Sequence, residues 1–445
     1  MTMNKEKEVN YVAPFASLVF LFLVVGFLTT ANGQFQAPLQ EAFLKGAGNL
    51  KNTFATLITF SWFLAYPLTG GIGSGWVTRF GYKSTLLRAL LLMIVGLGIF
   101  LLSSLFTMSF PDAGVSIFSA TIPFGYFIFL IGSFVVGASA TILQVVINPY
   151  LSACYVKGTQ SIQRLAIGGS SNSIGTTIAP FFVSGIVFGG LAMKQVKISQ
   201  LIAPFLALMA IMGLVVLVLS RLSMPDIPST KADAGEKLEK SVWSFSHLKL
   251  GVVAVFFYVG AEVCIGNNIN LYVIEYQEKV GAISFFGHDA LTLFGINFTI
   301  PALAATLYWF SILIGRLVGS SLSKVTPRVQ LTTVSSLALL MVLLSIATDN
   351  VWMLVTVGLF HSIMWGAIFT LAISQLGKYT SKASGVFMIG VVGGAILPLI
   401  QGAFADSLQS WRWTWLIVLF AEVYILYYAL IGSRVKQTAD LPVVE

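Results

Sequence analysis

Long apolar runs separated by short polar segments limit most strongly how this chain can fold. A helix that crosses a membrane needs about 20 mostly apolar residues, and such runs follow one another along almost all of the 445 residues. Only 9% of the residues are charged, whereas globular chains carry roughly 25%. So few charges cannot cover a water-facing surface. The sequence therefore predicts an all-α membrane protein and excludes a soluble domain, a disordered chain and a disulfide scaffold.

Twelve runs are long enough to span a bilayer. They cover approximately residues 11–38, 52–77, 84–107, 122–151, 166–190, 199–221, 248–274, 295–322, 329–347, 351–376, 383–403 and 412–433. The only long polar stretch separates the sixth run from the seventh. We therefore expect two six-helix bundles, at residues 1–222 and 248–445, joined by a linker at residues 223–247.

The two halves also echo each other. Gly175 precedes Pro180 by five residues in the fifth run, and Gly393 precedes Pro398 by five in the eleventh. Two pseudo-symmetric bundles with a site between them near mid-membrane form the layout of secondary transporters.

Lysine and arginine residues predict the orientation. With twelve spans both termini share one side, and 19 of the 25 basic residues fall on that side. The other six are Lys45, Lys51, Lys194, Lys197, Lys279 and Arg412. Since basic loops stay in the cytoplasm, we expect both termini there, and the net charge of +8 needs no nucleic acid to explain it. Cys154 and Cys264, one in each half, are expected as unpaired buried thiols.

Polar residues inside the spans are the best pointers to a substrate path, because they are costly in lipid unless they pair or face water. The candidate substrate-binding residues are Asn32, Gln34, Gln144, Asn148, Asn172, Glu262, Asn267, Asn297, His361 and Trp365. Amides donate and accept hydrogen bonds as sugar hydroxyls do, and no Lys or Arg lies deep in a span. The set therefore favours a neutral, hydroxyl-rich substrate. For any single amide the alternative is that it joins neighbouring helices in lipid.

Two carboxyl groups, Glu262 and Glu422, fall deep inside spans. A charge at a helix centre costs roughly 2.5–3.5 kcal/mol on insertion scales, so protonation or pairing is expected. Glu262 is a candidate proton carrier, with a purely structural acid as the alternative. Glu422, flanked by large apolar residues, is expected to be structural, and His361 to be a neutral hydrogen-bonding imidazole. No pattern indicates a metal site or a cofactor.

Several motifs in order resemble one known group. They are Gln144-Val-Val-Ile-Asn148-Pro149-Tyr150, Arg164-Leu165 with Asn172-Ser173-Ile174-Gly175, Tyr258-Val-Gly-Ala-Glu262, Gly315-Arg316-x-x-Gly319 and Gly393-Gly-Ala-Ile-Leu-Pro398. The chain resembles the major facilitator superfamily and, within it, the fucose/galactose/glucose:proton symporters. The segment with Arg79, Gly81 and Lys83 is similar to the superfamily's first cytoplasmic signature, although Thr78 replaces its usual Asp. By this resemblance Gly315 and Arg316 belong to the corresponding signature of the second half.

The departures from the family concern coupling. Fucose-type members carry an acid in span 1 and another in span 4, and here those positions fall on Gly33 or Gln34 and on Gln144. Our hypothesis is that Glu262 has taken over the coupling role. The resemblance implies a monomeric, multi-pass carrier of a hexose or related sugar in a bacterial inner membrane, with proton coupling first. Sugar uniport and sodium coupling stay open.

Other classes fit less well. An intramembrane enzyme would need a catalytic constellation, but His247, His288 and His361 are far apart in sequence and only His288 has an acid, Asp289, beside it. A receptor is disfavoured by twelve spans.

Overall fold

Helices make up nearly all of the computed structural model, which describes residues 11–117, 120–188, 196–224, 240–293, 295–320 and 325–435. The main elements of the first half are α1 (Val12–Gln34), α2 (Gln36–Phe43), α3 (Lys51–Ser109), β1 (Gly114–Ile117), β2 (Ala120–Pro123), α4 (Phe124–Ala153), α5 (Ser161–Phe181) and α6 (Ile202–Arg221). Those of the second half are α7 (Ser246–Lys279), β3 (Ala290–Leu293), β4 (Ile296–Thr299), α8 (Ile300–Ser320), α9 (Pro327–Thr348), α10 (Val351–His361), α11 (Met364–Ala372), α12 (Thr380–Phe387), α13 (Gly393–Leu408) and α14 (Trp415–Tyr427). Most of the expected linker lies outside the described residues.

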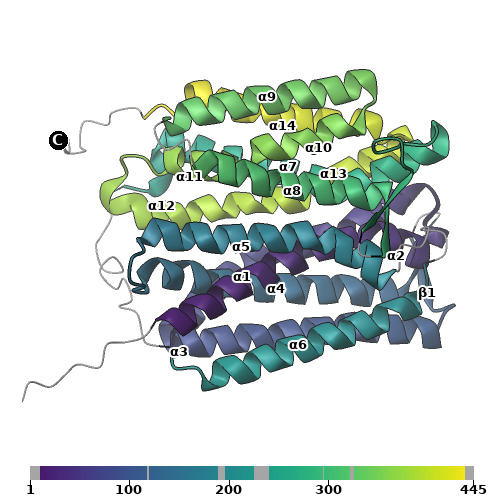
Figure 1. Cartoon of the computed structure of the whole chain (residues 1–445), viewed down its shortest axis with the longest axis horizontal. Helices are drawn as coiled ribbons and strands as arrows, with labels where there is room; N and C mark the ends of the chain where they lie inside the picture. The colour runs from purple at the N-terminus through teal and green to yellow at the C-terminus, as the bar shows by residue number, and fades with distance from the viewer. Residues whose placement is uncertain are drawn as a thin grey trace, which may run out of the picture.

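The helices of the two halves lie side by side with their axes roughly aligned (Figure 1). The first half, purple to teal, occupies one side of the bundle, and the second half, green to yellow, occupies the other. The start of α1 and the last described residues lie at the same end, here called the terminal end. Two antiparallel hairpins, β1–β2 and β3–β4, lie at the opposite end, here called the hairpin end.

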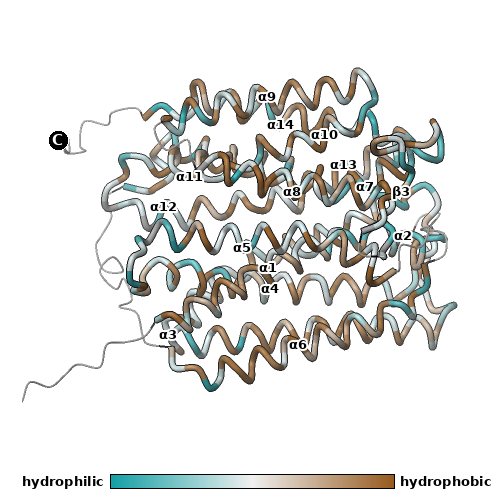
Figure 2. Tube along the Cα trace, viewed as in Figure 1, coloured by the Kyte–Doolittle hydropathy of each residue, from teal (hydrophilic) through white to brown (hydrophobic). Residues whose placement is uncertain are grey.

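Length, composition and surface all fit a chain that crosses a membrane many times. Among the described residues, nine helices are long and apolar enough to span a bilayer, or ten if α10 and α11 count as one bent span. Apolar residues line the middle of the bundle and polar ones gather toward its two ends (Figure 2). The outer faces are apolar, as at Leu214 and Leu217 on α6 and Phe420 on α14, which are 61%, 60% and 62% exposed. The protein is a multi-pass membrane protein.

Two helix breaks divide the expected spans, one at Gly81 and one after His361. The expected second and third spans form α3, a helix of 59 residues with one non-helical residue, Gly81, at φ 76° and ψ 172°. Only glycine adopts that conformation without strain, so Gly81 turns the chain between the two halves of α3. α10 and α11 form an angle of 43° at a break directly after His361.

Most expected spans coincide with helices, but the eighth begins later than predicted. We expected it to start near residue 295, whereas the chain there forms strand β4, which pairs with β3 through Asn297 opposite Thr292. Gly295, with φ 77°, lies in the turn between the strands. α8 therefore starts at Ile300.

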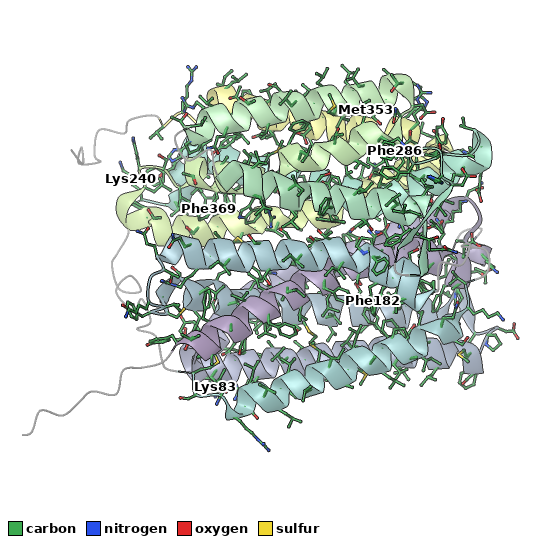
Figure 3. All side chains as sticks on the ribbon, viewed as in Figure 1. Lys83, Phe182, Lys240, Phe286, Met353 and Phe369 are labelled. Atoms are coloured by element: carbon green, nitrogen blue, oxygen red, sulfur yellow. The ribbon has the colours of Figure 1, made fainter. Side chains whose placement is uncertain are left out.

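The cysteines and the basic residues were also predicted from the sequence. Cys154 and Cys264 are free and buried, as predicted. Lys83 and Lys240, two of the basic residues expected on one side of the membrane, both lie at the terminal end, while Phe286 lies at the hairpin end (Figure 3).

Candidate functional site

The two halves meet along α1 and α7 through side-chain amides. Gln34 Nε2 donates to the Gly266 carbonyl at 2.9 Å. Asn267 Nδ2 donates to Thr59 Oγ1 on α3 at 3.3 Å, while Asn267 Oδ1 is buried and finds no partner among the described residues. Gly33 allows this approach, because a Cβ there would overlap the Asn267 amide. The structure therefore brings the predicted residues Gln34 and Asn267 to the contact between the halves.

α4 presents two of the predicted amides. Gln144 is half-buried, and its Nε2 donates to the hydroxyl of Tyr66 at 2.7 Å. Asn148 is also half-buried, and its side chain makes no hydrogen bond within the described part of the chain. Residues four apart share a helix face, so these amides offer neighbouring hydrogen-bonding groups.

Two other predicted amides hold helices together. Asn32 is buried, donates to the Ile58 carbonyl at 3.2 Å and accepts from Ser133 Oγ at 2.9 Å. Asn172 Nδ2 on α5 donates to the Phe22 carbonyl on α1 at 3.0 Å. Both side chains therefore perform the helix-joining role that was the alternative for each amide.

Glu262 lies in the middle of α7 among aromatic side chains. Its Oε1 accepts from the Tyr258 hydroxyl at 3.0 Å, and its side chain is half-buried. The Tyr258 ring lies 6.4 Å from the ring of Trp365 on α11, centroid to centroid. Trp365 is half-buried and packs edge-on against Phe387. An acid, a phenol and an indole thus converge in one place.

His361 is enclosed, which differs from its expected place along the path. Its ring is fully buried; Nδ1 lies 2.7 Å from the Tyr308 hydroxyl and Nε2 lies 2.6 Å from Glu422 Oε1. Sequence reasoning named His361 and Glu422 separately and missed both their pairing and Tyr308. The available signal was that two titratable groups buried in lipid need partners.

Asn297 does not join the other candidates. It lies in β4 at the hairpin end, is exposed, and accepts a hydrogen bond from Thr292 Oγ1 at 2.7 Å. The expectation that it sits inside a span is wrong, because the apolar run around it forms a β-hairpin.

The predicted signature residues lie toward the terminal end. Lys83 Nζ donates to the Ser220 carbonyl on α6 at 2.9 Å, and the guanidinium of Arg79 lies 5.1 Å from the centre of the Phe80 ring. Gly315 packs α8 so closely against α10 that a Cβ there would overlap Ser362.

Arg316 links the halves. Its Nη1 donates to the Gly169 carbonyl at 3.1 Å and to the Ser173 hydroxyl, both on α5. Arg316 therefore connects α8 of the second half to α5 of the first.

The hairpin end is held by a carboxylate that crosses between the halves. Asp406, near the end of α13, accepts from the Asn52 amide at 3.0 Å, from the Thr53 amide at 2.7 Å and from Thr53 Oγ1 at 2.6 Å. These donors lie at the start of α3, where unpaired N–H groups favour an anion. Asp406 thus caps a helix of the other half.

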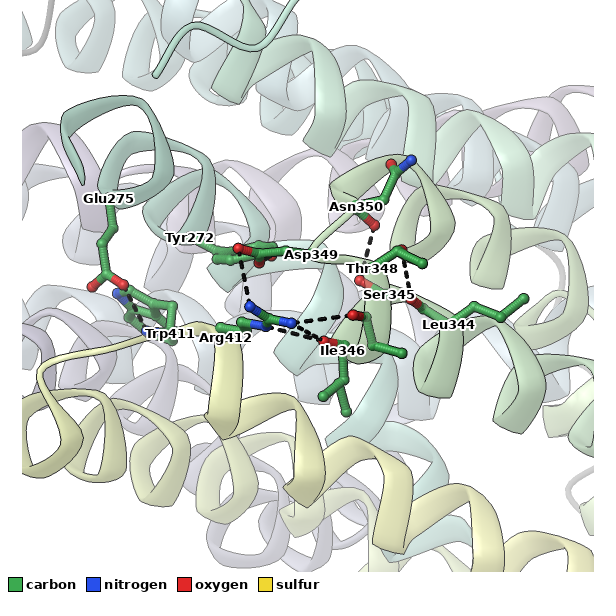
Figure 4. A network of polar contacts seen from close by, with 11 residues as sticks. Tyr272, Glu275, Leu344, Ser345, Ile346, Thr348, Asp349, Asn350, Trp411 and Arg412 are labelled. Atoms are coloured by element: carbon green, nitrogen blue, oxygen red, sulfur yellow. Dashed lines mark hydrogen bonds and ion pairs between the residues drawn. The ribbon is translucent and has the colours of Figure 1, made fainter. Parts of the chain in front are cut away.

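A second polar network braces the loops of the second half at this end (Figure 4). Arg412 Nη1 lies 3.6 Å from Asp349 Oδ2, and its Nε donates to the Ile346 carbonyl at 3.0 Å. The Tyr272 hydroxyl donates to Asp349 Oδ1 at 2.5 Å. This network joins α7 to the loops before α10 and α14, so it is a structural brace.

The polar groups of the site are amides, hydroxyls and one carboxyl group, and they lie beside aromatic rings. Within the described part of the chain, no group of three or more His, Cys, Asp or Glu residues could hold a metal ion. Two helical halves that meet through amides, with a half-buried acid and aromatic rings between apolar outer faces, form the layout expected of a membrane transporter.

Comparison with known proteins identifies the family. The family model described as Major Facilitator Superfamily matches residues 18–391, so the chain belongs to the Major Facilitator Superfamily. Its members are transporters and not enzymes.

Several curated proteins are similar over nearly their whole length. The "Glucose/galactose transporter" of Brucella abortus biovar 1 is 30% identical over 96% of this chain and 95% of its own. The "L-fucose-proton symporter" of Escherichia coli K12 is 25% identical over 89% of this chain and 88% of its own.

Solved structures confirm the fold. The fucose:proton symporter FucP in the outward conformation aligns with a TM-score of 0.62 at 22% identity, covering 96% of this chain and 100% of that one. The xylose transporter of E. coli in an inward open conformation aligns with a TM-score of 0.67 at 13% identity, covering 96% and 97%. The predicted major facilitator fold is thus confirmed.

Proposed function

We propose that this protein carries a neutral hexose or related sugar across the bacterial inner membrane by alternating access, with protons as the coupling ion. The observation that carries the proposal is the half-buried Glu262 beside Tyr258 and Trp365. An indole face suits the apolar face of a pyranose, and carboxyl and phenol groups accept and donate to its hydroxyls. The names of the glucose/galactose and fucose–proton relatives support the same substrate class.

The residues proposed to contact the sugar are those whose polar groups can still form hydrogen bonds or reach the path. Gln144, Asn148, Glu262, Asn267 and Trp365 are half-buried or carry an unpartnered polar atom. We propose that these side chains contact the sugar, with Gln34 closing the path beside Asn267. Asn32 and His361 are buried and their polar atoms are engaged within the protein. Asn172 is half-buried, but its Nδ2 holds α5 to α1, so we assign none of the three a direct contact with the sugar.

The proposed topology has twelve crossings with both termini in the cytoplasm. The nine single spans and the bent α10–α11 pair give ten. The break at Gly81 divides α3 into two crossings, and α5 adds the twelfth. The terminal end is then cytoplasmic, in agreement with the excess of basic residues there, and the protein is proposed to act as a monomer.

Alternating access would alternately open the contacts at the two ends. Asp406 and the Gln34–Gly266 contact close the hairpin end, and Arg316 joins α8 to α5 toward the terminal end. Rocking of the halves would break one group of contacts while the other holds, which exposes the site to one side at a time.

Counterflow of labelled sugars in proteoliposomes tests the function. A carrier preloaded with unlabelled sugar should transiently concentrate the labelled sugar, and Trp365→Ala should weaken this while Trp413→Ala, at an exposed position near the hairpin end, should not. Absence of counterflow for glucose, galactose, fucose and related hexoses would refute the proposed substrate class.

A further inference from the structure

A chain of hydrogen-bonding groups runs through the interior of the second half and connects four helices. Glu422 Oε1 on α14 lies 2.6 Å from His361 Nε2 on α10, and His361 Nδ1 lies 2.7 Å from the Tyr308 hydroxyl on α8. The same hydroxyl donates to the backbone carbonyl of Glu262 on α7 at 3.2 Å. Glu422, His361 and Tyr308 are each 0% exposed, and the proposed sugar contacts do not use them.

The number of protons on His361 and Glu422 depends on the direction of the Tyr308 hydrogen bond. A tyrosine hydroxyl has one hydrogen. If that hydrogen points to the Glu262 carbonyl, His361 Nδ1 must carry a hydrogen of its own and donate it to the Tyr308 oxygen. The contact between His361 Nε2 and Glu422 Oε1 then needs one more hydrogen. In that arrangement His361 and Glu422 together hold two protons, either as imidazolium and carboxylate or as imidazole and carboxylic acid.

Loss of one of these protons would reverse the bond at Tyr308. The neutral imidazole keeps its Nε2–H and donates it to the Glu422 carboxylate. Nδ1 then has a lone pair, so the Tyr308 hydroxyl turns to donate to Nδ1 and leaves the Glu262 carbonyl. The pair changes from net charge zero to net charge −1. The Glu262 carboxylate, on which His361 acts electrostatically, would take up the released proton and become a neutral acid.

We propose that His361 and Glu422 form a second proton-holding site of the transport cycle, which exchanges its proton with Glu262 and signals its occupancy to α7 through Tyr308. This inference rests on the proposed function for its place in transport, but the proton site itself is a property of the protein alone. This site supplies a buried acid–base pair in a chain that lacks the span 1 and span 4 acids of fucose-type members, whose positions fall on Gly33 or Gln34 and on Gln144.

The surroundings favour a function beyond holding helices together. Glu422 Oε2 is buried without a hydrogen-bond partner among the described residues, and an unpaired carboxylate oxygen in a low-dielectric interior is costly. The described groups that act electrostatically on this region are Glu262, Tyr258 and Cys264 from α7 and Tyr308 and Arg316 from α8. Arg316 is the fixed cation among them, and it offsets the negative charge as protons leave.

The test is infrared difference spectroscopy of the full-length protein in liposomes, titrated through the usual ranges of carboxyl and imidazole groups. Three variants are compared with the unmodified chain. Glu422→Gln removes the acid but keeps a hydrogen-bonding side chain, and Tyr308→Phe removes only the hydroxyl. Tyr428→Phe is the matched control, because Tyr428 is equally buried and also donates to a backbone carbonyl at 3.2 Å, that of His247.

The expected spectrum of the unmodified protein contains a carboxyl or imidazole band that titrates, is absent in Glu422→Gln, is shifted in Tyr308→Phe and is unchanged in Tyr428→Phe. Should Glu422→Gln fail to fold, the shift in Tyr308→Phe relative to Tyr428→Phe decides the question. No titrating band that depends on either residue would overturn the inference.

Transport assays of the same variants separate this inference from the proposed function. Glu422→Gln should keep sugar counterflow but no longer accumulate sugar above equilibrium, whereas the unmodified protein should approach about tenfold accumulation per pH unit for one proton per sugar. Full accumulation with an unchanged pH profile in Glu422→Gln would overturn the coupling role. Titrating bands in a protein that shows no sugar counterflow would uphold the proton site and refute the proposed function.

Discussion

Asp406 offers the sharpest test of how the two halves hold the hairpin end closed. Asp406→Asn keeps the size of the side chain and one acceptor oxygen, but it removes the charge and the second acceptor. Asp406 is 7% exposed and accepts three hydrogen bonds from Asn52 and Thr53 of the other half. Hydrogen bonds to charged groups contribute about 1.5–3 kcal/mol each. An asparagine whose oxygen takes the place of Oδ2 keeps the two bonds from Thr53 and loses the one from Asn52, so we expect the closed hairpin end to lose about 1.5–3 kcal/mol, the value of one such bond.

This loss predicts a measurable change in accessibility. A difference of 1.4 kcal/mol is a factor of ten in an equilibrium constant, so the population open at the hairpin end should rise roughly 10- to 100-fold. The probe is Thr56→Cys, because Thr56 is 0% exposed and packs against Gly402 across the same contact. Its rate of reaction with a membrane-impermeant maleimide, corrected for Cys154 and Cys264, reports the open population.

The matched control is Asp112→Asn, an exposed acid in the loop that follows α3. It should leave the labelling rate unchanged. A folded Asp406→Asn protein whose Thr56→Cys reacts no faster than in the parent chain would refute the idea that Asp406 holds the hairpin end closed.

Three further predictions follow from single positions. Glu262→Gln should abolish proton-driven accumulation. Counterflow should persist at a higher half-saturating sugar concentration, because the amide still bonds the sugar hydroxyls, and an uptake rate with its full pH dependence would contradict the coupling role. Gly81→Ala places a Cβ at φ 76° and should destabilise the protein by about 1–3 kcal/mol. The measurement is the unfolding temperature in detergent, which should fall. Gly71→Ala, at a helical position with open space around it, should leave that temperature unchanged. Asn297→Ala should leave the half-saturating sugar concentration unchanged while Asn148→Ala raises it, and the reverse order would refute the proposed site.

The sequence predicts helices well in this protein because the bilayer imposes the length and polarity of each span. The expected boundaries of the fourth, sixth and ninth spans fall within a few residues of α4, α6 and α9. The error near residue 295 arises because a short apolar run does not distinguish a strand from a helix. One local hint was Gly295, which lies in the hairpin turn with a positive φ.

The candidate site was less predictable, because partners depend on which helix faces meet. Gln34 and Gly266 are separated by 232 positions in the sequence, and His361 and Glu422 by 61. Hydropathy identifies each polar residue as costly in lipid, but it cannot say whether that residue faces the path, as Glu262 does in our proposal, or joins two helices, as Asn32 does. Only tertiary packing distinguishes the two roles.

The most direct test of the central claim is uptake of labelled hexoses into proteoliposomes under an inward proton gradient, an inward sodium gradient or no gradient. We predict accumulation above equilibrium under the proton gradient alone. Saturable entry that never exceeds equilibrium would contradict the coupling of sugar to an ion. Accumulation under the sodium gradient would mean that sodium, and not the proton, is the coupling ion. No saturable entry of any sugar would contradict the account as a whole.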